Sequence, residues 1–326
     1  MRPMSVTARV GAAVLALSAA SPALARSPLA GLFGHKSAAA APSRTASPTH
    51  GDYATSWDEY QAMRTAAHGG RKLDPAQLPD WRGLWNHERG FNFDPEQTGS
   101  RATAKLTPEY ARRYEEKLAR VAAGKEWDPL SACLPAGYPR WLVEPFLREF
   151  IVTPDETWLI NEGEDEIRRV YTDGRGHMPE DEAYPLWEGD SIGFWDGDTL
   201  VVHTNHLRAG AYQRLQPDYS DQVSTVERIR KIGPDVIEDL VTVYDPPALV
   251  KPWHVRHTYS RVTTPDLRIN QWVCEENNNV VPTADGSSTF ILPGEPGYKD
   301  PNKIGSSAWT GNPATANTQR SETVRL

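Results

Sequence analysis

Five short segments of this chain carry one ionisable side chain on an otherwise apolar strand face. Residues two apart on a strand point to the same side of the sheet, so each group shares its face with Val, Ile, Trp or Tyr. The groups are Glu162, Tyr171 followed by Asp173, Glu227, Asp239 and His257. A buried charge needs a partner or takes a shifted pKa, which is the environment of a general acid or base. If these faces point into one interior, we expect His257 and Glu227 to act as acid and base. The substrate-binding candidates on the same faces are Trp158, Glu162, Asp239 and Trp253.

The same ionisable groups also have a structural interpretation. They could form salt bridges with Arg169, Arg228 or Arg256, or they could simply face solvent. Both interpretations stay open, because alternation alone does not say which face of a strand is buried.

A second cluster of reactive side chains lies in one turn, which follows a predicted strand. Tyr171, Asp173, Arg175 and His177 place a phenol, a carboxylate, a guanidinium and an imidazole close together. We expect them to polarise or orient a substrate, since loops on a rigid scaffold commonly carry function. The side chains expected to approach this turn are Arg140, Trp187, Asp190 and Ser191. Local turn capping is the alternative role of Asp173 and Asp190.

The chain contains none of the short motifs that hold nucleotides or mark common hydrolases. There is no G-x-G-x-x-G, P-loop, G-x-S-x-G or H-E-x-x-H segment. The two H-x-x-H spacings, His203/His206 and His254/His257, resemble zinc ligands. However, residues three apart on a strand point to opposite faces. We therefore expect neither a cofactor nor a metal.

A change of period near residue 146 predicts the fold that positions these residues. From there on, β-branched and aromatic segments alternate with turns, and Asp196-Gly197 is typical of a two-residue hairpin. The nine candidate strands are residues 148–153, 156–162, 166–173, 190–196, 198–205, 224–232, 235–245, 253–262 and 267–276. We expect a mainly β (α+β) fold, in which an antiparallel meander closes into a barrel or a strongly curved sheet and so hides its edges.

Two helices are expected before these strands. Ser56 and Glu59 have the spacing of a capping box, and Gly69-Gly70 ends the first helix. The second helix has Thr107 as its N-cap and Pro108 at its first position, and it ends at Gly124.

The two ends of the chain differ in composition from its centre. Residues 1–25 combine two arginines, an apolar run and the small-x-small site Ala23-Leu24-Ala25, as in a secretory signal cleaved after Ala25. An uncleaved anchor is the alternative, although the run is about half of the ~20 residues that span a bilayer. We expect 26–50 to be a flexible linker, 51–281 a single β-rich domain and 282–326 a polar, partly disordered tail. The protein is thus expected to be periplasmic or secreted, with no stable membrane insertion after cleavage.

The net charge and the cysteine content limit which binding partners and which cellular compartment we expect for this protein. A net charge of −8 argues against nucleic acid as a partner. In an oxidising compartment, Cys133 and Cys274 are most simply one disulfide, which would join the loop before the strands to the last predicted strand. A catalytic thiol is the alternative.

Several blocks of the chain resemble a family of exported bacterial proteins of unknown function. The blocks are PDWRGLW (79–85), CLPAGYPR (133–140), YTDGRGH (171–177), GDSIGFWDGDTLVVHT (189–204), VERIRKIGPD (226–235) with the DPP turn after it, KPW (251–253) and CEEN (274–277). The resemblance implies no particular reaction. One departure is His203, where the family pattern has Asp. The WDGDTLVV block and the strands after it are also similar to lipocalin-like barrels, which implies that fold.

Together these observations predict an exported barrel with an aromatic-lined pocket for a small apolar or aromatic organic molecule. We expect cofactor-independent acid–base chemistry, as in a lyase, an isomerase or a hydrolase. One alternative is a non-catalytic periplasmic carrier of hydrophobic ligands. The other is an interaction protein of the envelope that uses its two ends as tethers.

Overall fold

The computed structural model describes residues 53–88, 92–97, 103–126, 128–272, 280–282, 288–290 and 296. The predicted signal and linker, most of the predicted tail, and Cys274 lie outside the described residues. Within the described part, no helix is both long enough and apolar enough to cross a membrane.

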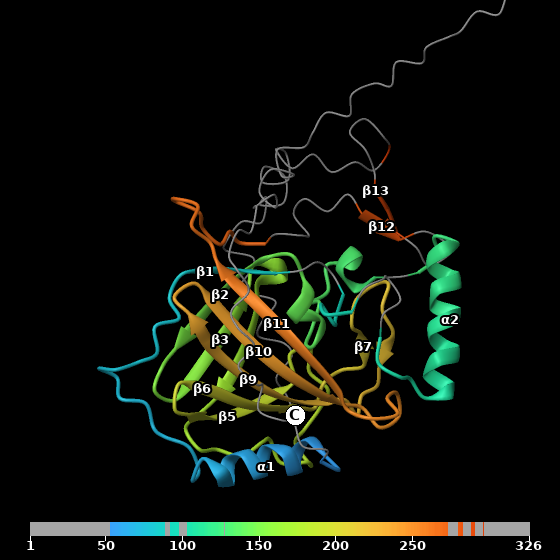
Figure 1. Cartoon of the computed structure of the whole chain (residues 1–326). Helices are drawn as coiled ribbons and strands as arrows, with labels where there is room; N and C mark the ends of the chain where they lie inside the picture. The colour runs from blue at the N-terminus through green and yellow to red at the C-terminus, as the bar shows by residue number, and fades with distance from the viewer. Residues whose placement is uncertain are drawn as a thin grey trace, which may run out of the picture. The chain divides into compact units, whose positions relative to one another are not determined.

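Nine strands form a closed barrel, which confirms the predicted mainly β fold (Figure 1). Around the barrel they follow the order β1-β11-β10-β9-β6-β5-β4-β3-β2. Their bounds are β1 Leu84–His87, β2 Leu147–Val152, β3 Glu156–Asn161, β4 Glu166–Tyr171, β5 Asp190–Asp196, β6 Thr199–Asn205, β9 Ser224–Gly233, β10 Val236–Tyr244 and β11 Trp253–Arg261.

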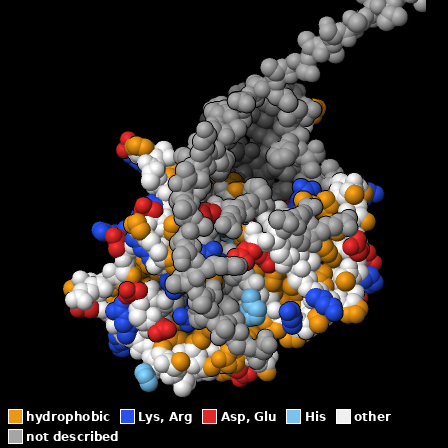
Figure 2. All heavy atoms as spheres, viewed as in Figure 1, with side chains coloured by type: hydrophobic (Ala, Val, Ile, Leu, Met, Phe, Trp, Pro, Cys, Tyr) orange, Lys and Arg blue, Asp and Glu red, His pale blue; other side chains and the backbone are white. Residues whose placement is uncertain are grey.

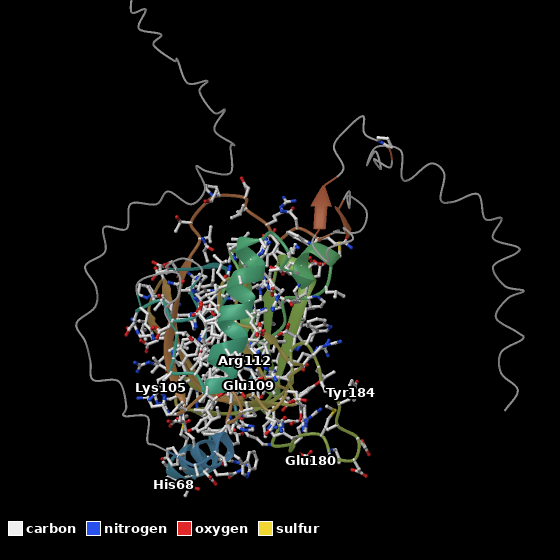
Figure 3. The ribbon with its side chains drawn as sticks, turned by 90° about the vertical axis from the view of Figure 1, so that its right-hand side faces the viewer. His68, Lys105, Glu109, Arg112, Glu180 and Tyr184 are labelled. Carbon is white, nitrogen blue, oxygen red and sulfur yellow. The ribbon has the colours of Figure 1, made fainter. Side chains whose placement is uncertain are left out.

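Two details of the predicted meander are wrong. The ninth barrel strand is β1, whereas residues 267–272 of the predicted last strand are not in a strand. In addition, β4 and β5 run parallel, and every other neighbouring pair runs antiparallel. A closed ring of alternating directions needs an even number of strands, so a nine-stranded barrel must contain a parallel pair. The long connection between β4 and β5, which extends away from the barrel at Glu180 and Tyr184 in Figure 3, allows this change of direction.

The two predicted helices are present, and each has its own place outside the barrel (Figures 1 and 3). α1 (Ser56–Ala66) packs on the outer face of β6, β9 and β10. Its Glu59 reaches the outer side of β10, where Oε2 accepts from Tyr244 Oη at 2.9 Å. α2 (Pro108–Ala122) is anchored through Lys117, whose Nζ lies 2.6 Å from an Asp218 carboxylate oxygen in the short strand β8 (Asp218–Tyr219). The solvent face of α2 carries charge pairs such as Glu109–Arg112.

Short elements complete the described chain. β7 (Gly210–Ala211) pairs with β8 (Asp218–Tyr219), and β12 (Val280–Pro282) pairs with β13 (Ser288–Phe290). The 3-10 turns are η2 (Pro129–Ala132), η3 (Arg140–Val143) and η4 (Gly163–Asp165). Basic and acidic side chains are interspersed on the face shown in Figure 2 and do not gather by sign.

The barrel interior changes character along its length. Near the β5–β6 and β9–β10 hairpins it is filled by apolar side chains, including Trp195, Leu200, Ile229 and Ile237. Towards the other ends of β5, β6 and β9 the inward positions become polar, as at Ser191, Thr204, Thr225 and Glu227, whereas β10 stays apolar there at Val241 and Val243. A core that could have been apolar throughout therefore holds a polar region that needs its own network of partners.

Candidate functional site

One buried ion pair organises the polar part of the interior. Arg168 on β4 binds both carboxylate oxygens of Glu227 on β9, with Nη1 2.9 Å from Oε1, and both side chains are buried. Further guanidinium N–H groups of Arg168 donate to Ser191 Oγ at 3.1 Å and to Thr204 Oγ1 at 2.6 Å. A forked pair of this kind fixes both side chains. Glu227 therefore lies inside the barrel, but its two oxygens are occupied.

The carboxyl groups near this pair differ in how strongly burial disfavours their ionised form. Arg148 and Arg168 are both buried, and the carboxyl groups in electrostatic range of one or both are Glu144, Glu166, Glu188, Glu227 and Asp239. Burial, followed by the charge of Glu227, raises the pKa of Asp239 well above its ordinary value. Burial, followed by the charge of Glu166, does the same to Glu188. Burial therefore favours the protonated form of Asp239 and of Glu188.

Several buried oxygen atoms beside the ion pair have no hydrogen-bond partner among the described residues. Three of them are Tyr138 Oη, Tyr259 Oη and Asp239 Oδ1, and the others are Thr225 Oγ1 and the two carboxyl oxygens of Glu188. Both phenols lie within electrostatic range of the Asp239 carboxyl and of the Arg168–Glu227 pair. Burial raises the pKa of both tyrosines well above the ordinary value, so both keep their protons and can donate.

His257 adds a nitrogen to this region. It lies on β11 directly opposite Asp239 on β10. Its Nδ1 is 3.3 Å from His87 Nε2, whereas its Nε2 is buried and has no partner among the described residues. Burial, and then the charge of Arg148, lower the pKa of His257 to about 3, so the ring is neutral. Nε2 is the acceptor nitrogen when Nδ1–H donates to His87.

The loop that carries Tyr138 is held in place by its backbone. Tyr138 N donates to Trp187 O at 2.8 Å, and Gly137 N donates to Glu166 Oε1 at 2.7 Å. Gly137 has a φ of +71°, and a Cβ there would lie 3.0 Å from Trp187 O, so both the conformation and the space favour glycine. The Arg168 guanidinium stacks 3.7 Å from the centroid of the Tyr138 ring. These contacts fix the phenol inside the barrel.

Strand alternation predicted the inward face correctly for three strands and wrongly for two. The inward faces of β9, β10 and β11 carry Glu227, Asp239, Trp253 and His257 as expected. On β3 the inward residues are Thr157, Leu159 and Asn161, so Trp158 lies on the outer face. Glu162, just after β3, accepts from Asn270 N at 2.9 Å at the surface. On β4 the inward residues are Glu166, Arg168 and Val170, which places Tyr171 on the outer side.

The Tyr171–His177 turn does not bring its four reactive side chains to one point. Arg175 pairs with Asp173 at 2.6 Å and lies 4.1 Å from the centroid of the Tyr171 ring, at the surface. The hydrogen bonds from Arg175 lower the pKa of Asp173. His177 turns instead towards Asp190, with Nδ1 2.8 Å from Oδ2. None of the four lines the barrel interior.

The remaining binding candidates have packing or pairing roles. Arg140 is buried against two carboxylates of its own loop, Asp128 at 2.9 Å and Glu144 at 2.5 Å. Trp187 supports the Tyr138 loop through its carbonyl oxygen. Trp253 does point into the barrel, where it packs against Phe93 and Tyr212.

The predicted site residues did not include most of those that surround the unpartnered atoms, namely Tyr138, Arg148, Glu166, Arg168, Glu188 and Tyr259. Tyr259 shares its strand face with His257, as the alternation of the sequence indicates. Tyr138 lies in the CLPAGYPR loop, from which Arg140 was the predicted site residue. Nothing local marks Arg168, since its partner Glu227 is 59 residues away.

The described residues contain no group of three or more His, Cys, Asp or Glu side chains placed to hold a metal ion. His254 and His257 point to opposite faces of β11, as the spacing predicted: His254 bonds Thr242 on the outer side, and His257 is inside. A comparison with protein-family models found no match for this chain, and a comparison with curated proteins found none either.

Proposed function

We propose that this protein binds a small organic molecule in its barrel and catalyses a proton transfer on it without a cofactor. The molecule would have an apolar or aromatic body and an oxygen that accepts hydrogen bonds. An isomerase, a lyase or a hydrolase would fit this chemistry.

The observation that carries the proposal is the set of unpartnered polar atoms inside the barrel. Tyr138 Oη, Tyr259 Oη, Asp239 Oδ1 and His257 Nε2 all lack a partner among the described residues. A buried polar atom without a partner costs roughly 1–3 kcal/mol. Retaining four of them near one another is costly for a purely structural core. A bound molecule that satisfies them would recover much of that cost.

Each group has a natural role in such a reaction. The two phenols donate to the substrate oxygen, and the protonated carboxyl of Asp239 is the acid. A phenol and a neutral carboxylic acid are a donor pair suited to stabilising an enolate. His257 takes the proton at Nε2 when its Nδ1–H donates to His87. Glu227, whose carboxylate is bound by Arg168, positions the side chains around it. The proposed acid is therefore Asp239 and not Glu227.

A non-catalytic carrier is the second candidate, and the aromatic lining favours it. Phe93, Trp253 and Tyr212 form a cluster with ring centroids 4.4 to 5.1 Å apart. Such a cluster could hold an apolar body without any chemistry.

Native mass spectrometry of the purified full chain tests the proposal. We expect wild type to carry a co-purified small molecule. Tyr138→Phe and Tyr259→Phe should each weaken its binding roughly tenfold, because each removes one hydrogen bond. Tyr171→Phe, the same change on the outer face, is the matched control and should bind like wild type. Equal occupancy in all four proteins, or no bound molecule in wild type, would refute the proposal.

The enzyme and the carrier are separated by the fate of that molecule. Asp239→Asn keeps the size of the side chain and removes its acidic proton. If the protein is an enzyme, wild type converts the added compound with time and Asp239→Asn leaves it unchanged. If both leave it unchanged, the carrier is the correct function.

We also propose that the protein is exported and that Cys133 and Cys274 are paired. Cys133 follows η2, and β12, which begins six residues after Cys274, lies against η2. We expect native protein to resist thiol alkylation and to take up two alkyl groups after reduction and unfolding. Alkylation of Cys133 in the native, unreduced protein would instead indicate a free thiol.

A further inference from the structure

A chain of hydrogen bonds crosses the outer face of the barrel beneath the start of α1. Asp190 Oδ2 lies 2.8 Å from His177 Nδ1, and His177 Nε2 lies 2.7 Å from His203 Nδ1. His203 Nε2 lies 2.9 Å from Ser56 Oγ. Ser56 Oγ is also 2.7 Å from Ser224 Oγ at the beginning of β9. The chain links a carboxylate to a serine hydroxyl through two imidazoles.

The carboxylate at one end determines the direction of every hydrogen bond in the chain. Burial opposes ionisation of Asp190, but hydrogen bonds from His177 and from Met178 N hold its pKa below the ordinary value. The ionised carboxylate must accept, so His177 donates from Nδ1, and when both imidazoles are neutral His177 accepts at Nε2. His203 then donates from Nδ1 and accepts at Nε2. The hydroxyl of Ser56 is therefore the donor to His203.

The local sequence explains why Ser56 is free for this role. The predicted N-cap was Ser56, but Thr55 caps α1 instead, with its Oγ1 accepting from Asp58 N at 3.1 Å. Ser56 becomes the first helical residue, and its hydroxyl turns towards β6. Trp57 packs over the two imidazoles, and its ring centroid lies 5.3 Å from that of His203 and 5.9 Å from that of His177.

The site lies just below the surface and outside the barrel interior. Ser56 is 5% exposed, and Trp57, beside it, is 42% exposed. Figure 1 shows α1 next to β5 and β6, where Asp190 and His203 are located. At the start of α1 the backbone N–H of Trp57 has no acceptor inside the helix, so it is a donor for the ester carbonyl oxygen that becomes an oxyanion when Ser56 Oγ bonds to the acyl carbon.

We propose that Ser56 is a nucleophile for acyl transfer from carboxylic esters, activated by His203, with His177 and Asp190 as positioning residues. The order of the groups matches that of a serine–histidine–aspartate triad with one additional imidazole. This site does not depend on the function proposed for the barrel interior.

The reaction balances with water as the only other reactant. Ser56 Oγ forms a bond to the acyl carbon while its proton passes to His203 Nε2. The ester C–O bond then breaks, and His203 returns the proton to the leaving alkoxide. Water attacks the acyl-serine in the same way, which releases the carboxylic acid and restores the hydroxyl. The positive charge on His203 is shared through His177 with the Asp190 carboxylate.

An alkyl fluorophosphonate tests this inference on the full chain. The probe forms an Oγ–P bond and loses fluoride, so intact mass reports one adduct and peptide mapping locates it. We expect one adduct on Ser56 in wild type and none in Ser56→Ala. His203→Gln should slow labelling by at least a hundredfold, as expected for loss of a general base. Asp190→Asn should also slow it, because it removes the group that orders the two imidazoles.

Ser260→Ala is the matched control. Ser260 is on the outer side of β11, where its hydroxyl donates to Glu88, and its loss should leave labelling unchanged. No adduct in folded wild type, or an adduct mapped to another residue, would overturn the proposal. Peptide mapping of wild type decides this even if one of the variants does not fold.

Discussion

Replacing Glu227 and Asp239 together, as Glu227→Gln/Asp239→Asn, should lower the free energy of unfolding by about 3–5 kcal/mol. The double change removes the ion-pair partner of Arg168 and the nearby Asp239 carboxyl, so that Glu188 is the carboxyl group still within electrostatic range of the buried guanidinium. A buried, uncompensated guanidinium is one of the most destabilising groups a core can hold. Urea denaturation followed by tryptophan fluorescence at neutral pH measures the loss.

The losses of unfolding free energy in the two single variants should not add up to the loss in the double variant. In Glu227→Gln the charge that raises the pKa of Asp239 in addition to burial is gone, so Asp239 can ionise more readily and pair with Arg168 in its place. Asp239→Asn removes a carboxyl group whose neutral form is favoured by burial. The coupling between the two positions is therefore expected to be large, as for residues of one network.

A charge-free replacement is the control. Arg168→Met with Glu227→Leu removes both members of the ion pair and should be close to neutral in stability, since a well-packed apolar pair often substitutes for a buried ion pair. If Glu227→Gln and Asp239→Asn prove additive, Asp239 does not replace Glu227, and the protonation pattern proposed for the interior is wrong.

The chain's local pattern was sufficient for the fold but not for the polar interior. Strand lengths, turn residues and hidden edges predict a barrel whatever its contents. The inward face was clear on β10, where one face is apolar but for Asp239. On β3 both faces are apolar, so Trp158 and Leu159 were equally good candidates for the inside. Only closure of the barrel, through β1, decides between them.

Long-range pairing decided the position of the buried arginine. Arg168 and Arg169 are adjacent, so one of them must point inwards on a strand. An isolated arginine is rarely buried. The predicted inward face of the strand was therefore the one on which Arg169 lies between apolar neighbours. Arg168 is nevertheless inside, because Glu227 comes from a strand that the chain reaches much later. The same limit applies to Ser56, whose hydroxyl became available only because the helix is capped one residue earlier.

Acidification should destabilise the folded protein through His87, His203 and His257, whose pKa values burial lowers. Burial is the first cause that lowers the pKa of both His203 and His257, to about 3 in each case, whereas an unfolded histidine titrates near 6.5. Between these values the unfolded chain binds more protons than the folded one, so stability falls as the pH falls below 6.5. At pH 5, roughly 1.5 units below the unfolded pKa, each histidine should cost about 2 kcal/mol.

Buried carboxyl groups act in the opposite direction, so variants are needed to isolate the histidines. The pKa of Asp239 and that of Glu188 are raised in the folded state, which stabilises the protein below the unfolded carboxyl pKa and is lost as the pH rises through the folded values. The wild-type profile is the sum of both effects. Comparing unfolding by urea at pH 7.5 and pH 5 in wild type and His257→Gln cancels the carboxyl contribution. The loss on acidification should be smaller by about 2 kcal/mol in the variant.

His68 provides the matched control for this comparison. It lies on the surface just after α1, as Figure 3 shows. The stability lost between pH 7.5 and pH 5 should therefore be the same in His68→Gln as in wild type. His203→Gln should behave like His257→Gln, although the two rings lie on opposite faces of the barrel wall. If both variants keep the full wild-type loss, the two rings are not held neutral by burial. The folded pKa of each ring would then lie close to the unfolded value of about 6.5.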